Sequence, residues 1–327
     1  MPDVVAFGEA MMRLAPPHFQ RIEQARSFDV EIGGAELNTA VGLVRLGRSA
    51  EWVSALPANP LGEAVRNRVR EFGVGTGGVR VTAEGRCGLY FLEFGAAPRA
   101  GSIVYDRTDS SLALSKPGDF DWPTVLRGAR WFHVTGITAA LSTGCAALVL
   151  EGLQAARHGG LGTSLDLNYR SKLWSVADAG RTLSELLPHV DLLIASLADA
   201  EQLFGIRGSS FAEVARQFTD RFGVKFVAGV VRETPLVWRN RFGAVGYSAG
   251  QSQETPTYEV EIVDRLGTGD AFAAGLIHGL LDGDFAKGLA YGAALGALKH
   301  SIPGDLPLIR LEEVEAVLAG QGLRIRR

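Results

Sequence analysis

Short apolar runs alternate with longer stretches of helical periodicity along most of the 327-residue chain. This alternation predicts βαβ units and a parallel sheet, and several runs almost lack polar positions, which is typical of strands that helices cover on both faces. The expected strands lie at residues 4–8, 51–56, 131–135, 162–167, 192–195 and 225–231. The expected helices lie at residues 35–46, 60–72, 143–158, 177–187, 211–222 and 269–281. The pattern therefore predicts an α/β fold around a central, mostly parallel sheet.

Two stretches, at about residues 11–32 and 86–108, break this rhythm and look extended instead. Apolar and polar residues alternate at 89–94 and 102–107, as in strands with one buried face. We expect these stretches to form a small β-sheet lid inserted into a single domain over residues 1–327. The lid would cover the carboxyl ends of the parallel strands, where such sheets bind ligands. Because the edges of an exposed sheet need covering, we expect a dimer joined through the lid.

Composition and charge narrow the class of protein. Hydrophobic residues make up 46% and charged residues 21% of the chain, which is ordinary for a folded globular protein. The net charge of −3 gives no electrostatic drive towards nucleic acid or an anionic membrane, and no apolar run approaches the roughly 20 residues that span a bilayer. The N-terminal residues lack the pattern of a signal peptide. Cys87 and Cys145 lie far apart without a metal-binding spacing, so we expect packing residues in a cytoplasmic protein without disulfides.

The segment with the most chemical information is Gly267-Thr268-Gly269-Asp270, where an apolar run turns into a strong helix pattern. A glycine-rich turn entering a helix directs backbone N–H groups and the positive end of the helix dipole at one point. That arrangement suits a phosphate, or a phosphoryl group in transfer. Asp270 would then accept the proton of an attacking hydroxyl group. Taken alone, the tetrapeptide is better explained as an ordinary turn with an aspartate that caps the helix.

Longer motifs around this segment resemble the two signatures of the ribokinase-like, or pfkB, family of carbohydrate kinases. Residues 264–275 match the second signature and residues 33–47 match the first. Within the family, segments 132–138, 166–174 and 298–305 are most similar to the 2-keto-3-deoxygluconate kinases. The resemblance covers nearly the whole chain. It implies a three-layer ribokinase-like domain that uses ATP and Mg²⁺ to phosphorylate an alcohol group of a keto-deoxy sugar acid.

The resemblance also implies a catalytic site and a sugar site. Asp270 would be the catalytic base, and Gly267, Thr268 and Gly269 would form the anion hole. The residues that would bind the sugar acid are Gly33, Gly34, Asn38, Tyr90, Tyr105, Arg107, Asn168, Arg170 and Asp305. The arginines suit a carboxylate because a guanidinium group can bind it through two parallel hydrogen bonds. Structural alternatives exist for all of these residues: a glycine pair at a helix start, tyrosines that pack in a sheet, solvated arginines or an ordinary turn.

Further residues would bind the nucleotide and its metal ion. They are Ser196, Arg232, Asp264, Lys299 and, for Mg²⁺, Asp199. Asp264 is explained nearly as well as a structural cap, and Lys299 as a surface residue. For Arg232 the default interpretation is an exposed ion pair with Glu233.

Two positions depart from the family pattern. Ser196 stands where the family usually has Asn, and the acidic residue three positions later is the shorter Asp199. Serine reaches less far and lacks an amide donor, so we expect metal use that is weaker or differently arranged. Thr268 stands where the family prefers Ala or Gly. A β-branched residue penalises positive φ, so the turn must keep Thr268 at negative φ.

The leading hypothesis is phosphorylation of the terminal hydroxyl group of 2-keto-3-deoxygluconate to give the 6-phosphate. A kinase for another sugar, such as fructose or 2-keto-3-deoxygalactonate, is the nearest alternative. A catalytically weak sugar-binding or regulatory homologue is a third, motivated by Ser196 and Leu197. A dinucleotide-dependent dehydrogenase is disfavoured, because Gly8-Glu-Ala-Met11 follows the first expected strand where such enzymes carry a GxGxxG motif.

Overall fold

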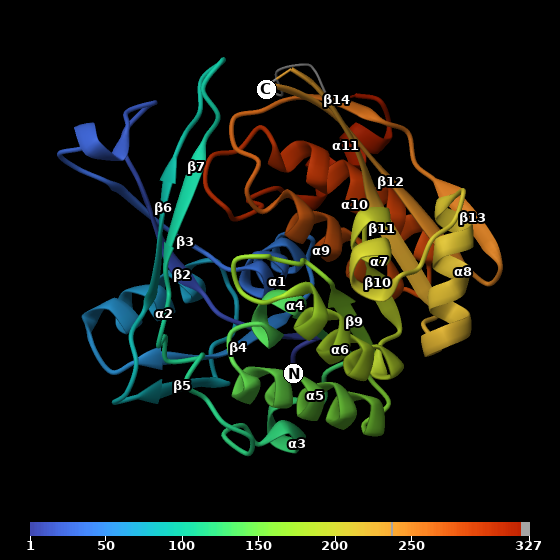
Figure 1. Cartoon of the computed structure of the whole chain (residues 1–327), viewed down its shortest axis with the longest axis horizontal. Helices are drawn as coiled ribbons and strands as arrows, with labels where there is room; N and C mark the ends of the chain where they lie inside the picture. The colour runs from blue at the N-terminus through green and yellow to red at the C-terminus, as the bar shows by residue number, and fades with distance from the viewer. Residues whose placement is uncertain (237, 322–327) are drawn as a thin grey trace.

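The computed structural model describes residues 1–236 and 238–321. A ten-stranded sheet forms the centre of this part of the chain (Figure 1). In spatial order its strands are β13 (Gln251–Glu254), β12 (Arg239–Ser248), β11 (Phe226–Leu236), β10 (Leu192–Ile194), β9 (Gly162–Asp166), β8 (Trp131–Thr135), β1 (Val4–Phe7), β4 (Ala50–Pro57) and β5 (Val79–Thr82), and β14 (Tyr258–Glu261) pairs with β12. The strands from β11 to β5 pair in parallel, whereas β12 is antiparallel to its neighbours. The prediction of a mostly parallel sheet is therefore confirmed, and β11 continues beyond its expected end.

Helices cover both faces of this sheet, which gives the three layers that were predicted. One face carries α3 (Trp122–Val125), α4 (Gly136–Ala139), α5 (Thr143–His158), α6 (Val176–Leu186), α7 (Leu197–Phe204) and α8 (Phe211–Phe222). The other face carries α1 (Ala35–Arg45), α2 (Pro60–Glu71), α9 (Thr268–Leu280), α10 (Phe285–Lys299) and α11 (Leu311–Leu318). Short 3₁₀ turns are η1 (Ile22–Gln24) and η2 (Leu187–His189). Side-chain caps fix several helix starts, for example Asn59 before the Pro60 of α2.

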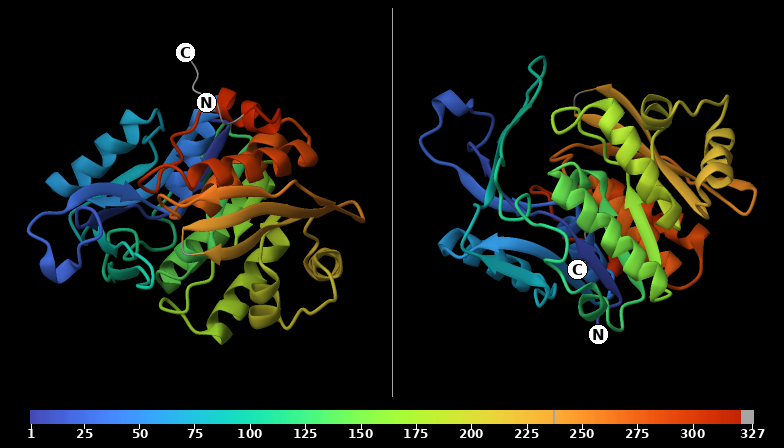
Figure 2. Two further views of the ribbon diagram at one scale, coloured as in Figure 1. Left: turned by 90° about the horizontal axis from the view of Figure 1, so that it is seen from above. Right: turned by 60° about the horizontal axis from the view of Figure 1, so that its bottom comes forward.

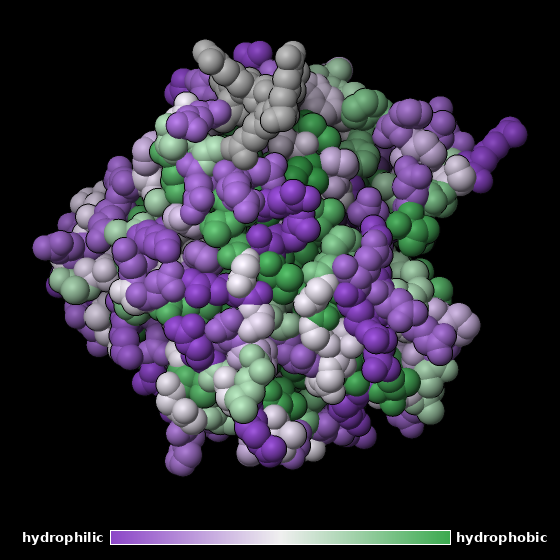
Figure 3. Space-filling model, turned by 180° about the vertical axis from the view of Figure 1, so that it is seen from behind, coloured by the Kyte–Doolittle hydropathy of each residue, from purple (hydrophilic) through white to green (hydrophobic). Residues whose placement is uncertain are grey.

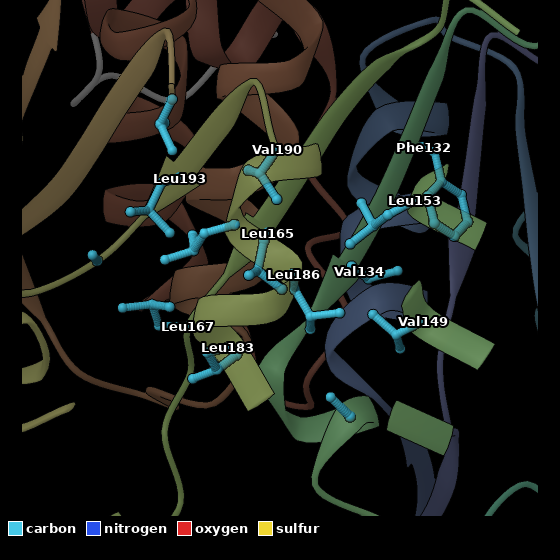
Figure 4. Close-up of a cluster of buried hydrophobic side chains, with 14 of the residues drawn as sticks. Phe132, Val134, Val149, Leu153, Leu165, Leu167, Leu183, Leu186, Val190 and Leu193 are labelled. Carbon is cyan, nitrogen blue, oxygen red and sulfur yellow. The ribbon is translucent and has the colours of Figure 1, made fainter. Parts of the chain in front are cut away.

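The largest apolar cluster lies between the sheet and the helices of the first face (Figure 4). Phe132 of β8 and Leu165 of β9 point into it, and Leu153 and Leu183 meet them from α5 and α6. His133, the residue after Phe132 in β8, points to the other face of the sheet and is also fully buried. Burial of both faces explains why these strands read as apolar runs, and burial of each large apolar side chain contributes roughly 1.5–3 kcal/mol.

Helix α9 lies unusually close to α10. A Cβ atom on Gly275 would lie 2.3 Å from the backbone nitrogen of Gly292, and one on Gly279 would lie 2.2 Å from that of Gly288. The two helices can therefore approach this closely only because glycines occupy the contact. This packing fixes the position of α9, whose first turn carries the glycine-rich motif.

A second sheet stands off the main sheet and forms the lid (Figure 2). Its strand order is β3 (Asp29–Gly33), β2 (Met11–Ala15), β6 (Gly88–Glu93) and β7 (Ser102–Asp106). All four strands coincide with the two stretches that were expected to form it, except that β3 extends one residue further, to Gly33. The loop between β2 and β3 reaches the start of β12 in the main sheet, since the Phe19 ring packs edge-on against the exposed Trp238 ring with centroids 5.5 Å apart.

The face shown in Figure 3 carries mostly polar side chains, with apolar side chains among them. Within residues 1–236 and 238–321, none of the helices is long and apolar enough to cross a membrane. Cys87 and Cys145 are both buried and unpaired, as expected for packing residues.

Candidate active site

A cavity of about 890 Å³ lies between the lid and the carboxyl ends of the parallel strands. Lid strands, the start of α1, the loop after β9 and the turn before α9 all contribute to its walls. Eleven of the residues that the sequence singled out line it: Gly33, Gly34, Asn38, Tyr90, Tyr105, Arg107, Asn168, Arg170, Gly267, Asp270 and Asp305. The cavity therefore brings the predicted base together with every residue expected to bind the sugar.

Asp270 lies in the first turn of α9, beside the anion-binding end of the helix. Gly267 precedes the helix with φ of 80°, and a Cβ atom there would lie 1.9 Å from the carbonyl oxygen of Asp305, so only glycine fits this turn. The space in front of Gly269 is open. The half-buried Asp270 carboxylate accepts a 2.7 Å hydrogen bond from Asn38 Nδ2. Burial raises the pKa of Asp270 to about 6, and the Asn38 hydrogen bond opposes that rise.

Thr268 is the first residue of α9, so it has the helical, negative-φ conformation that was expected. Its hydroxyl group donates to the carbonyl oxygen of Arg265 and accepts a 3.1 Å hydrogen bond from Arg232 Nη2. The alternative in which Arg232 pairs with Glu233 is wrong, because Glu233 pairs with Arg241 instead. Adjacent residues of a strand point to opposite faces, which separates the two side chains. Arg232 thus reaches the anion-binding turn from β11.

The glycine pair before α1 serves close packing. A Cβ atom on Gly33 would lie 2.4 Å from Asp305 Oδ2, and one on Gly34 would lie 2.0 Å from the carbonyl oxygen of Glu9. Both glycines also line the cavity. The structural alternative therefore explains their identity, and it is compatible with the predicted approach of a sugar to the backbone.

A buried cluster of charges lies behind the wall of the cavity that Tyr90 and Asp305 line. Arg13 Nη1 contacts Asp305 Oδ1 at 2.7 Å, and Arg13 Nη2 contacts Asp264 Oδ2 at 2.6 Å. The hydroxyl group of Tyr90 donates to the other oxygen of Asp305 at 2.6 Å. Asp264 also accepts hydrogen bonds from the backbone N–H groups of Leu266 and Gly304, which favours the structural interpretation of that residue.

Arg107 and Arg170, the two arginines that could bind a carboxylate, differ in their surroundings. Arg107 is nearly buried and forms a salt bridge with the buried Glu9, whose other oxygen has no hydrogen-bond partner. Arg170 is exposed, and its guanidinium group donates only a 3.3 Å hydrogen bond to the carbonyl oxygen of Tyr169 among the described contacts. Asn168, two residues earlier, has φ of 40°, an uncommon conformation that asparagine tolerates better than most residues. Arg107 is therefore positioned in advance, whereas Arg170 has freedom to move.

The loop after β9 also meets the lid. Lys172 Nζ donates a 3.4 Å hydrogen bond to the carbonyl oxygen of Ile103 in β7, and both residues line the cavity. Tyr105, on the same lid strand, is 40% exposed and lies beside Tyr90 with ring centroids 5.9 Å apart. Both the lid and the loop after β9 of the main domain therefore border the cavity.

Ser196 and Asp199 lie outside the cavity at the start of α7. The Ser196 hydroxyl group accepts from the backbone N–H of Asp199 at 3.0 Å and donates to its carboxylate at 2.7 Å. This is a helix cap, in which Ser196 is exposed and Asp199 is half-buried. Asp166, at the end of β9, is a functional candidate that sequence reasoning quoted within a motif but gave no role. Burial and then the negative charge of Asp270 raise its pKa to about 7, and Asp199 adds to that effect. These carboxylates therefore influence one another through their charge, although within residues 1–236 and 238–321 no group of three or more His, Cys, Asp or Glu side chains is placed to hold a metal ion.

Lys299 is fully buried, so the alternative of a surface position is wrong. Its ammonium group donates a 2.9 Å hydrogen bond to the carbonyl oxygen of Ile302. Burial lowers its pKa, whereas the nearby Asp264 and Asp305 oppose that change. Lys299 thus adds a positive charge behind the cluster around Arg13.

Glu36 was missed from the sequence, where it looks like an ordinary acidic residue in the first turn of a helix. It is 1% exposed and borders the cavity. One carboxylate oxygen accepts from the backbone N–H and the hydroxyl group of Thr135 and from the hydroxyl group of Thr138. Burial raises the pKa of Glu36 to about 7, against the effect of these donors. Glu36 therefore joins the start of α1 to the ends of β8 and α4.

Comparison with known proteins agrees with this geometry. The family model described as pfkB family carbohydrate kinase matches residues 1–306. A 2-dehydro-3-deoxygalactonokinase of Haloferax volcanii is 39% identical over 326 residues, which cover 99% of each chain. A solved structure of a 2-dehydro-3-deoxygluconokinase from Thermotoga maritima is 40% identical, with a TM-score of 0.94 over 97% of this chain and 98% of its own. A 2-dehydro-3-deoxygluconokinase of Bacillus subtilis is 28% identical over 98% of this chain and 96% of its own. The chain therefore belongs to the pfkB family of carbohydrate kinases and is an ATP-dependent sugar kinase with a ribokinase-like fold.

Proposed function

We propose that this kinase phosphorylates the terminal hydroxyl group of a 2-keto-3-deoxy sugar acid, with 2-keto-3-deoxygluconate as the first candidate. The observation that carries the proposal is the distribution of charge in the cavity: Asp270 stands at the anion-binding end of α9, and Arg107 and Arg170 lie elsewhere on the walls. A sugar acid has a hydroxyl group at one end and a carboxylate at the other, so it complements both features. Its epimer 2-keto-3-deoxygalactonate has the same groups, and relatives with both names resemble the chain.

In this proposal Asp270 acts as the general base. Its ionised carboxylate takes the proton of the terminal hydroxyl group, and the oxygen forms a bond to the γ-phosphorus of ATP. The bond between that phosphorus and the β–γ bridging oxygen breaks, and ADP leaves with the electron pair. The backbone N–H groups at the start of α9 and the helix dipole stabilise the charge on the transferred group, with Gly267, Thr268 and Gly269 shaping that turn.

The residues that would bind the nucleotide and its metal ion lie outside the sugar cavity. Arg232 is the cation best placed for a phosphate, because it is hydrogen-bonded to Thr268 in the anion-binding turn. Ser196, which caps α7, would bind the nucleotide as the family resemblance implies. Mg²⁺ bound to the phosphates would supply charge neutralisation, with Asp166 and Asp199 as the carboxylates that face it. Lys299 would act through its charge, since its ammonium group is buried.

The lid would close over the bound sugar and keep water from the γ-phosphate, which limits ATP hydrolysis. We also propose that the lid joins two copies of the chain. Its outer strands β3 and β7 carry Val30 and Val104, which are 56% and 54% exposed. An exposed sheet edge with apolar residues invites pairing with a second copy.

A coupled assay of ADP release tests the proposal with both keto-deoxy acids, fructose and ribose as substrates. The expected result is a much higher kcat/KM for one of the acids than for either neutral sugar. Asp270→Asn serves as the control for contaminating kinases. A preference for fructose would overturn the acid assignment, and binding without turnover of every sugar would favour a catalytically weak homologue, for which the altered residue Ser196 is the motive.

A further inference from the structure

Arg13 connects three segments that are far apart in the sequence. It belongs to the lid strand β2 and is 3% exposed. Its partner Asp264 precedes α9, and its partner Asp305 lies between α10 and α11. Tyr90, from lid strand β6, binds the same Asp305. The lid therefore holds both core segments through a single guanidinium group and one tyrosine.

These two core segments shape the turn that binds the transferred phosphoryl group. The carboxylate of Asp264 accepts from the N–H of Leu266, directly before Gly267, and from the N–H of Gly304. The carbonyl oxygen of Asp305 lies against Gly267, at the position where any side chain would collide. A shift of either segment would therefore move Gly267, and with it the N–H groups at the start of α9.

The two carboxylates of the cluster, Asp264 and Asp305, require a cation that contacts both of them. Without Arg13, two buried carboxylates would face each other, and a buried charge without its partner is strongly destabilising. Lys299 lies nearby, but its ammonium group already donates to the carbonyl oxygen of Ile302. A planar guanidinium group can bind two carboxylates at once in fixed directions, which a single ammonium group at the same place cannot do.

We propose that Arg13 is a positioning residue that couples the lid to the anion hole, by holding the Asp264 and Asp305 segments against Gly267. The inference rests on the kinase activity of the family and not on the identity of the sugar. Its test therefore uses whichever sugar the wild-type enzyme phosphorylates, and it remains decisive if the sugar-acid assignment is wrong.

The main variant is Arg13→Lys, which keeps the positive charge but loses the bridge, and Arg13→Met removes the charge as well. We expect kcat to fall about 10- to 100-fold in both, because a misplacement of about 1 Å at the reacting groups has an effect of that size. KM for ATP should stay within about threefold of wild type, since the lost interaction acts in the transition state. If Arg13→Met does not fold, Arg13→Lys alone decides.

Arg157→Met is the matched control. Arg157 contacts the buried Asp191 at 2.6 Å, and Lys225 contacts the same oxygen at 2.8 Å. Asp191 directly precedes β10, so this cluster lies at the amino ends of the parallel strands, whereas the cavity lies at their carboxyl ends. The control should lower the melting temperature and leave kcat unchanged. The proposal is overturned if the Arg13 variants keep kcat within about twofold of wild type, if they raise KM alone, or if Arg157→Met lowers kcat as much as they do.

Discussion

Asn38 Nδ2 donates a 2.7 Å hydrogen bond to Oδ2 of Asp270, across 232 positions of the sequence. The contact joins the first turn of α1 to the first turn of α9, and Asn38 is 2% exposed. A hydrogen bond to the ionised form of a carboxyl group lowers its pKa, whereas burial raises it. In Asp270 burial outweighs the hydrogen bond, and the pKa is about 6. A base with this pKa is ionised at neutral pH and still accepts a proton readily.

The pH dependence of turnover should depend on the pKa of Asp270, which burial raises and the hydrogen bond from Asn38 lowers. Only ionised Asp270 can accept a proton, so kcat/KM should fall as pH drops through about 6. Asn38→Ala removes a donor that stabilises the ionised form, so the acid limb should move to higher pH. Arg170→Met should move it in the same direction, because the positive charge of Arg170 also lowers the pKa of Asp270. The measurement is kcat/KM from pH 5 to 9. An acid limb that stays in place in both variants would assign the titration to another group.

Replacement of the base gives a second test. Asp270→Asn keeps the size of the side chain but cannot accept the proton. We expect kcat to fall roughly 10²–10⁴-fold, the usual contribution of general-base catalysis, while ATP and sugar still bind. Isothermal titration calorimetry with each ligand checks binding, and the coupled assay checks turnover. A variant that keeps most of the wild-type kcat would remove Asp270 from the role of base.

The fold could be predicted because its signals are local. The apolar runs of β1, β8 and β10 have both faces buried, and the alternation in β6 follows its alternating burial. The helix at α9 was placed to within one residue because the glycine-rich turn marks its start. The antiparallel strands β12 and β13 could not be predicted in this way, because β12 combines charged, glycine and apolar residues and β13 contains only polar residues.

The site was predictable only where a motif carried it. Asp270 and Asn38 were found together because both belong to family signatures. Arg13 could not be found, because its partners lie 251 and 292 positions away and a lone arginine in a strand is ordinarily taken as solvated. The same holds for Glu9, which neutralises Arg107 from the end of β1.

The altered metal motif can be tested through magnesium dependence. Asp199 is half-buried in the first turn of α7, and its side chain contacts only the capping residue Ser196 among the described hydrogen bonds, so its substitution should not disturb the core. We expect Asp199→Ala to raise the Mg²⁺ concentration needed for half-maximal rate, because one carboxylate near the phosphates is lost. Ser196→Asn restores the family residue and should be tolerated. Glu201→Ala is a suitable control, since Glu201 lies on the same helix as Asp199 and pairs with the exposed Arg207 in the loop after that helix. An unchanged Mg²⁺ titration for Asp199→Ala would show that the metal is held elsewhere.

The substrate class can be tested at the two arginines of the cavity. Charge-assisted hydrogen bonds contribute about 1.5–3 kcal/mol each, so Arg170→Ala should lower kcat/KM for the sugar acid roughly 10- to 100-fold. Arg107→Ala should have the larger effect. It removes the same kind of contact and also leaves the buried Glu9 as an unpaired negative charge near the carboxylate.

The double variant Glu9→Gln/Arg107→Ala separates these two contributions. Without the charge of Glu9, it should recover stability and part of the kcat/KM for the acid, and the remaining loss measures the contact with Arg107. Turnover of a neutral sugar should change far less in all three variants, because that substrate has no carboxylate to bind. Lysine at either arginine position should rescue only partly, since an ammonium group cannot present two parallel donors. Arg80→Ala is the control, because Arg80 pairs with Asp119 outside the cavity. Equal losses on acid and neutral sugars would mean that both arginines support the fold, and that the carboxylate is recognised elsewhere.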